Sequence, residues 1–186
     1  MKAALLCTLA GALTGLAALP AAAEGPFAYY PIYEIKGGVL AHDVPGLWSG
    51  FQVEKSSADI NLEVMFSPSL PFLGGAIRPA LGGTINTAGQ TSHAYLDARW
   101  QYETPFGMYF GFGLGGAIHD GAIGPDDGYD KKWLGSRVLF HIPLEVGYRF
   151  DAHNSLSVYF EHTSNAYTAT YNEGLDRIGV RYGWRY

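Results

Sequence analysis

The sequence predicts an all-β fold, an eight-stranded antiparallel transmembrane β-barrel, from its composition and from the spacing of its apolar residues. Charged residues make up only 16% of the 186 residues, whereas aromatic residues reach 15% and there are 25 glycines. The mean hydropathy of +0.02 is too low for a bundle of membrane helices and high for a soluble domain. These values are typical of a barrel with one apolar and one polar face. The formal net charge of −5 excludes a general nucleic-acid binder, which is basic.

The N-terminal segment has the features of a cleaved secretory signal peptide, which we expect to cover residues 1–23. Lys2 supplies a positive charge, an almost wholly apolar stretch follows, and Ala21–Ala23 offer a small-residue cleavage site. A membrane anchor is the alternative, but the apolar stretch is short and no basic flank follows it. We therefore expect a single barrel domain over 24–186. The single cysteine, Cys7, lies in the predicted signal, so the mature chain carries no thiol and no disulfide.

Eight segments after the signal are expected to be strands, because apolar residues recur in them at every second position or nearly so. In chain order they are 32–43, 58–66, 76–87, 93–102, 107–118, 136–150, 154–164 and 175–186. The alternation is weaker in the first and third of these segments than in the others.

The apolar rows justify the stronger strands one by one. The second strand has the row Ile60, Leu62, Val64 and Phe66. The fourth has Ala94, Leu96, Ala98, Trp100 and Tyr102, and the fifth alternates Met108, Phe110, Phe112 and Leu114 largely with glycines. The sixth has the longest row, Val138, Phe140, Ile142, Leu144, Val146, Tyr148 and Phe150. The seventh has Leu156, Val158 and Phe160, and the last has Ile178, Val180, Tyr182 and Trp184.

The connections between these strands alternate in length. Residues 103–106 and 151–154 form tight turns, whereas 44–57 and 119–135 are longer and polar. Short periplasmic turns and long outer loops are the pattern of bacterial outer-membrane barrels. We therefore expect the barrel in the bacterial outer membrane. The connection 67–75 is longer than a tight turn, and the pattern does not explain its length.

A soluble sandwich or a lipocalin-like barrel is the alternative fold, because its strands alternate as well. In a soluble barrel the apolar row faces inward, whereas in a membrane barrel it faces lipid and the charges pair inside. The last strand carries three arginines in one row, Arg177, Arg181 and Arg185. Carboxylates that can pair with them lie on the matching polar rows of other strands: Glu63, Asp97, Glu145 and Glu161. This pairing favours the membrane barrel.

Polar residues interrupt the apolar row of two consecutive strands. His162 and Ser164 continue the outward row of 154–164, and Asp176 starts the outward row of the next strand, because side chains at i and i+2 share a face. Antiparallel neighbours bring these three residues together at the outer rim. A hydroxyl, an imidazole and a carboxylate are the parts of a nucleophile, base and orienting acid. The alternative is a set of ordinary polar residues at the aqueous interface.

At these residues the sequence resembles the outer-membrane lipid A 3-O-deacylase family, whose pattern is His-x-Ser-Asn-Ala followed by Asn-x-Gly-apolar-acid. The matching segments here are His162–Ala166 and Asn172–Asp176, and weaker glycine-rich likenesses extend over most of the mature chain. The resemblance implies an eight-stranded barrel that hydrolyses the ester-linked acyl chain at the 3-position of lipid A. It implies that His162, Ser164 and Asp176 carry the hydrolysis. The best-known members of the family have a glutamate where this chain has Asp176.

Ester hydrolysis also needs hydrogen-bond donors for the developing oxyanion. Asn165 and Asn172 lie in the turn beside Ser164 and are the candidates, although asparagine is also common in ordinary turns. We expect no cofactor. We expect no metal site either, because His42-Asp43 and His119-Asp120 lack the close ligand spacing of such sites and are better suited to holding loops.

The expected partner is lipid A, or lipopolysaccharide, of the outer leaflet. Three lysines of the long outer loops, Lys55, Lys131 and Lys132, either meet its phosphates or are solvated loop charges. The leading function is a Ser-His-Asp esterase acting on lipid A. The alternatives are a non-enzymatic small barrel, serving as a structural protein, an adhesin or a narrow pore, and an acyltransferase that passes the acyl chain to another lipid.

Overall fold

The computed structural model describes residues 31–186. The predicted signal peptide over 1–23 and Cys7 therefore lie outside the described residues. Nine strands form one antiparallel sheet, and a short 3-10 helix, η2 (Pro125–Asp127), lies in an outer loop. The strands are β1 (Ile32–Ala41), β2 (Ala58–Phe66), β3 (Leu70–Phe72), β4 (Gly75–Asn86), β5 (His93–Glu103), β6 (Met108–His119), β7 (Val138–Arg149), β8 (Asn154–Ser164) and β9 (Leu175–Arg185).

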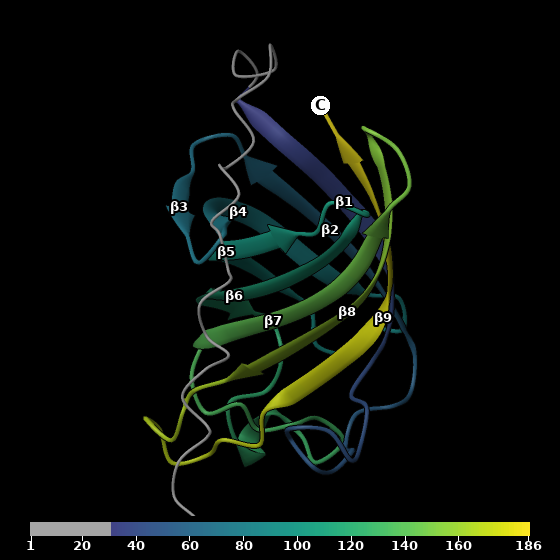
Figure 1. Ribbon diagram of the computed structural model, residues 1–186. Coiled ribbons are helices and arrows are strands. Elements are labelled where there is room, and N and C mark those ends of the chain that lie inside the picture. Colours follow the sequence, from purple (N-terminus) through teal and green to yellow (C-terminus); the bar gives the residue numbers. More distant parts are fainter. Residues whose placement is uncertain (1–30) are drawn as a thin grey trace, which may run out of the picture.

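The sheet closes into a barrel of eight strands, as the sequence predicts (Figure 1). Seven pairings join strands that are consecutive around the barrel wall, and the pairing of β1 with β9 joins the two ends of the described chain. The short strand β3 pairs only with β4 and is not part of the closed ring. It accounts for the long connection 67–75, which the alternation pattern left unexplained. The Trp100 indole N–H donates to the Phe72 carbonyl at 2.8 Å and fastens this extension to the wall.

The two faces of the wall differ as a membrane barrel requires. The apolar row of β7 is exposed on the outside, with Val138 63% and Tyr148 47% exposed at its two ends. The polar row of the same strand, including His141 and Glu145, is buried inside. The same alternation occurs in β2, β5, β6 and β8. Apolar side chains outside and charges inside are the arrangement that lipid stabilises.

The interior of the barrel is filled by ion pairs. The guanidinium of Arg181 contacts Glu145 at 2.8 Å and Glu63 at 3.4 Å, and its carbon lies 3.5 Å from the centre of the Tyr159 ring. Glu145 also accepts from Lys36 at 2.9 Å. Buried charges are tolerated where each has an opposite charge and hydrogen bonds. Arg181 is only 1% exposed, so the described barrel has no water-filled lumen at this level.

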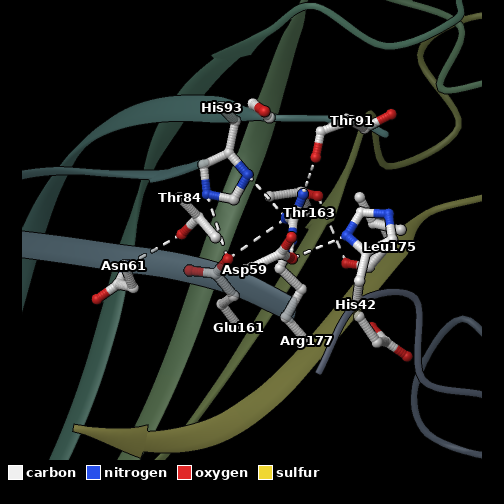
Figure 2. A network of polar contacts seen from close by, with 12 residues as sticks. His42, Asp59, Asn61, Thr84, Thr91, His93, Glu161, Thr163, Leu175 and Arg177 are labelled. Carbon is white, nitrogen blue, oxygen red and sulfur yellow. Dashed lines mark hydrogen bonds and ion pairs between the residues drawn. The ribbon is translucent and has the colours of Figure 1, made fainter. Parts of the chain in front are cut away.

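Nearer the outer rim, Arg177 gathers a second group of interior polar residues (Figure 2). Its side chain donates to Asp59 at 2.5 Å, to the Thr91 carbonyl at 2.7 Å and to His93 Nδ1 at 2.8 Å. Glu161 lies 3.3 Å from the same guanidinium. With Arg185 bound to Glu103 at 2.6 Å, the three arginines of the last strand all meet carboxylates. Asp97 is the exception among the predicted partners, because it pairs with His141 at 2.8 Å instead.

The two ends of the barrel differ in the length of their connections (Figure 1). The start of β1 and the end of β9 lie at the end with the short turns 104–107 and 150–153, whereas 42–57, 120–137 and 165–174 lie at the other end. Leu134 of the 120–137 loop forms a small apolar core with Leu139 of β7 and Leu175 of β9. Among residues 31–186, no helix has the length and apolar character needed to cross a membrane.

This arrangement predicts which loops face the cell exterior. A tag inserted near Gly128 in the 120–137 loop is expected to bind antibody on intact cells, because long loops of such barrels point outward. A tag near Ala152, in the turn 150–153, is expected to bind antibody only after the outer membrane is permeabilised. The two tags control for each other, and the opposite labelling pattern would contradict the predicted orientation.

Candidate active site

The register of the wall brings the three predicted residues together. His162 pairs directly with Asp176 across the β8–β9 ladder, and Ser164 is the last residue of β8. Leu156, Val158 and Phe160 precede His162 and Ser164 on the same outward row of β8. Because side chains two positions apart share a face, this row runs from the apolar residues of the wall to the polar residues at the rim. The outward direction and the rim position are those expected from the sequence.

The side chains form one hydrogen-bonded chain. The His162 Nδ1–H donates to Asp176 Oδ1 at 2.6 Å, and His162 Nε2 lies 2.9 Å from Ser164 Oγ. Because an ionised carboxylate only accepts, the proton of the neutral imidazole sits on Nδ1 and leaves Nε2 free to accept the serine hydroxyl proton. The 2.6 Å distance also shows that Asp176, although one methylene shorter than a glutamate, reaches the imidazole. This is the arrangement of a serine nucleophile, a base and an orienting acid.

Two of the three residues are covered rather than open to the surroundings. Asp176 is fully buried and His162 is 4% exposed, whereas Ser164 remains partly accessible. The cover comes from the loop 44–57, in which Trp48 stacks on the imidazole with ring centres 4.6 Å apart and planes 10° from parallel. An outward site at a barrel rim thus becomes a shielded one, with the hydroxyl as its accessible atom.

Comparison with known proteins identifies the family. The family model described as "Lipid A 3-O-deacylase (PagL)" matches residues 42–185. The chain belongs to this family. The match includes all three residues of the hydrogen-bonded chain, and together with the barrel fold it places the protein in the outer membrane. A search of curated protein sequences finds no match.

Two solved structures have a similar fold. One is the crystal structure of the outer membrane enzyme PagL, with a TM-score of 0.60 and 20% identity, covering 81% of this chain and 97% of that one. The other is a de novo designed transmembrane β-barrel, with a TM-score of 0.50 and 10% identity, covering 84% of this chain and 98% of that one. At these identities the likeness concerns the fold of the barrel.

The two candidate oxyanion residues have different surroundings. The side-chain amide of Asn165 donates to the carbonyls of Leu134 at 2.8 Å and Tyr171 at 2.5 Å, so it holds two outer loops together. The backbone N–H of Asn165 donates to Asn172 Oδ1 at 2.9 Å. That bond engages the side-chain oxygen of Asn172 and not its Nδ2, which is the donor of this amide. The donors of Asn165 thus bond within the outer loops, and a catalytic role for either asparagine stays a prediction.

Lys132, one of the three lysines of the long loops, has neither of the two roles expected for it, a contact to lipid phosphate or a solvated charge. The reason is that its side chain is fully buried. Its ammonium pairs with Asp43 at 2.8 Å and donates to the Phe51 carbonyl at 2.7 Å and to Ser49 Oγ at 3.1 Å. Its position in a polar loop gave no sign of this, because burial of a lysine depends on a partner distant in sequence. Lys55 is exposed.

His42 and Asp43, together with His119 and Asp120, hold loops in place. His42 bonds to Asp59 at 2.8 Å and to Glu54 at 2.7 Å. Burial alone would lower the pKa of His42, but these two hydrogen bonds outweigh burial and raise the pKa above its usual value. Burial likewise favours a higher pKa for Glu54, but hydrogen bonds from His42 and Thr91 lower that pKa to about 2.

The same structural role applies to the second pair. His119 Nε2 donates to the Ser136 carbonyl at 2.6 Å, and Asp120 accepts from the backbone N–H of Ser92 at 2.7 Å. Together the two pairs connect the ends of β1 and β6 to neighbouring loops.

One interior group has the spacing of metal ligands. His93, His141 and Glu161 offer ligand atoms that all lie within 4.8 Å of one another. The surroundings do not suit a cation, because Arg177 donates to His93 Nδ1 at 2.8 Å and thereby leaves the ring proton on Nε2, the atom that would have to bind the metal. His141 is already held between Asp97 and Glu161. These residues fit a hydrogen-bonded interior better than a metal centre.

Proposed function

We propose that this outer-membrane protein hydrolyses the ester that joins the 3-position acyl chain to the sugar of lipid A. Membership of the lipid A 3-O-deacylase family supports the reaction. The observation that carries the mechanism is the chain Asp176–His162–Ser164, with separations of 2.6 Å and 2.9 Å, whose accessible end is the serine hydroxyl. The outward position at the outer rim suits a substrate whose acyl chains lie along the barrel wall.

In the proposed mechanism, Ser164 Oγ attacks the ester carbonyl carbon while His162 Nε2 takes its proton. Asp176 keeps the imidazole in the productive tautomer and stabilises the imidazolium. The imidazolium then returns the proton to the sugar oxygen as the bond from the carbonyl carbon to that oxygen breaks. The sugar hydroxyl is released, and the acyl group remains on Ser164. A water molecule, deprotonated by His162, attacks the carbonyl carbon of this acyl-enzyme. The bond from that carbon to Ser164 Oγ breaks, the imidazolium returns the proton to Oγ, and the free 3-hydroxy fatty acid is released.

The tetrahedral intermediates of both steps carry a negative oxygen that needs donors. We assign this role to Asn172 Nδ2 with backbone N–H groups of the turn 165–172 other than those of Asn165 and Thr168, which already donate within the turn. The Asn165 side-chain amide is also bonded already, to loop carbonyls. Removing one oxyanion donor typically costs about 10²–10³ in kcat.

The alternative functions are less well supported by the same geometry. A pore is disfavoured because the interior arginines Arg99, Arg177 and Arg181 are at most 1% exposed. A structural barrel or adhesin has no need of a hydroxyl bonded to a shielded His–Asp pair on its outer wall. An acyltransferase would share the acyl-enzyme step and differ only in the acceptor, so its product distinguishes it.

The reaction is tested by mass spectrometry of lipid A from cells with and without the protein. Hydrolysis is expected to remove one 3-hydroxyacyl group from lipid A and to release the corresponding free fatty acid. A transferase would instead place that acyl group on a second lipid. Unchanged lipid A in cells that contain the folded barrel would contradict the proposal and favour a structural role.

A further inference from the structure

The acid of the site is held by a loop far away in the sequence. Asp176 Oδ1 binds His162, and its second oxygen, Oδ2, accepts from the Ser49 backbone N–H at 2.6 Å and from Ser49 Oγ at 3.0 Å. Both donors come from one residue in the loop 44–57. With one oxygen on the base and two donors on the other, the carboxylate cannot rotate without breaking a hydrogen bond.

Ser49 is in turn oriented by the buried ammonium of Lys132. Lys132 Nζ donates to Ser49 Oγ at 3.1 Å, so the hydroxyl accepts from the lysine and donates its own proton to Asp176. A hydroxyl that accepts from a cation is a better donor, because hydrogen bonds in a chain polarise one another. Lys132 is fixed by Asp43 at 2.8 Å and by the Phe51 carbonyl at 2.7 Å, which lie on either side of Ser49 in the sequence.

Two further contacts pack around the base, one from the loop 44–57 and one from the segment 165–174. Trp48 stacks on one face of the His162 ring, as described above. Gly174 approaches the ring closely: a Cβ at Gly174 would lie 3.0 Å from His162 Cε1 and 3.5 Å from the Ser49 Cβ. Its φ of +63° is also in the region that favours glycine. The backbone at Gly174 and the loop 44–57 thus pack around the same imidazole.

We propose that Ser49, oriented by Lys132, is a positioning residue that holds Asp176 in the geometry required to orient His162. The inference rests on the proposed function and extends the hydrogen-bonded chain to Lys132–Ser49–Asp176–His162–Ser164. It assigns the outer loop 44–57 to the active site rather than to lipid or antigen contacts alone. Ser49 touches no reacting atom, so its effect passes through the acid to the nucleophile.

The test replaces Ser49 in the full-length barrel in detergent and measures two quantities. These are kcat and KM for lipid A, and the rate at which a small fluorophosphonate labels Ser164. Ser49→Ala is expected to lower kcat and the labelling rate in parallel by roughly tenfold, the effect of one hydrogen bond to a charged group. KM is expected to stay within about twofold, because the binding energy that the substrate and the transition state share is unaffected. Ser49→Thr, which keeps the hydroxyl, is expected to restore most of both rates.

The same loop offers a matched control. The hydroxyl of Ser56 accepts from Gln52 at 2.7 Å on the exposed side of the loop, so Ser56→Ala is expected to leave both rates at the parent value. A Ser49→Ala protein with an increased KM and unchanged labelling would show that the loop only binds substrate, and would overturn the proposal. Parent values for both rates in Ser49→Ala would also overturn it.

The link to Lys132 is tested by coupling. Lys132→Met combined with Asp43→Asn removes the pair without leaving a single buried charge, which would be strongly destabilising. This double variant is expected to lower the labelling rate. If Ser49→Ala is added to it, the total fold-loss in labelling rate is expected to be smaller than the product of the separate fold-losses. Independent, fully multiplicative losses would contradict the chain through Ser49.

Failure of the positioning role can be distinguished from failure of the proposed function. If Ser164→Ala protein still deacylates lipid A, the serine mechanism itself is wrong, whatever Ser49 does. If Ser164→Ala is inactive while Ser49→Ala equals the parent, only the positioning role is wrong.

Discussion

Replacing Ser164 by alanine is expected to reduce lipid A deacylation by several orders of magnitude. The hydroxyl supplies the nucleophile, and loss of one member of such a hydrogen-bonded set removes most of the rate enhancement of the whole set. Lipid A from cells that make Ser164→Ala protein should keep its 3-position acyl chain, as measured by mass spectrometry. His162→Asn is expected to have the same effect, because no base then accepts the serine proton.

The barrel itself should be unchanged by these replacements. Ser164 lies at the end of β8 on the outer rim and is partly accessible, so its removal opens no cavity in a packed interior. Ser164→Ala is expected to resist heat in detergent like the parent. His153→Asn is the matched histidine control, because His153 lies in the turn 150–153 at the opposite end of the barrel. Undiminished deacylation by Ser164→Ala would contradict the serine mechanism.

Replacing Asp176 by alanine is expected to have the second largest effect, a loss of roughly four orders of magnitude in kcat. Without the carboxylate, His162 loses the acceptor at 2.6 Å that keeps its Nε2 unprotonated and facing the serine. The imidazolium formed in the reaction also loses its counter-charge. The measurement is kcat for lipid A in detergent, with heat resistance checking that the barrel is folded.

Asp176→Glu is the informative companion of this change. It keeps the charge and restores the residue of the best-known family members, so we expect it to retain substantial activity. The longer side chain must displace Ser49, whose backbone N–H lies 2.6 Å from the carboxylate, so some loss of rate is expected. Wild-type hydrolysis by Asp176→Ala would show that another residue supplies the acid or that no acid is needed.

The strands of the barrel wall were predictable because the alternation of their side chains depends only on neighbouring residues in the sequence. A strand alternates its faces with a period of two, and lipid on one side with ion pairs on the other makes that alternation visible in the sequence. The ends of strands were less predictable. β1 ends at Ala41, before the predicted 43, and Asp43 has a φ of +48°, outside the extended conformation of a strand. The short strand β3 was missed because three residues are too few to show a period.

The relation of the three site residues was also predictable, and for the same reason. Consecutive antiparallel strands must place the end of one beside the start of the next, so His162 and Asp176 become neighbours once both strands are recognised. The outward direction of Ser164 follows from its parity with His162. The hydrogen-bond partners of Asn165 and Asn172 could not be predicted, because the partners of an asparagine side chain in a turn depend on which carbonyls lie nearby.

The loop that covers the site could be identified only from the tertiary structure. Ser49 lies 127 positions from Asp176, and Lys132 lies 83 positions from Ser49, in aperiodic loops that meet only because the barrel closes. A loop residue takes its role from whatever the fold brings beside it, so the sequence marked Lys132 as a surface charge and left Trp48 and Ser49 unremarked. The wall and the row of polar residues on it therefore follow from local sequence patterns. Closure of the barrel decided which loop shields them, because hydrogen bonds between distant loops form only at the separations that the closed wall imposes.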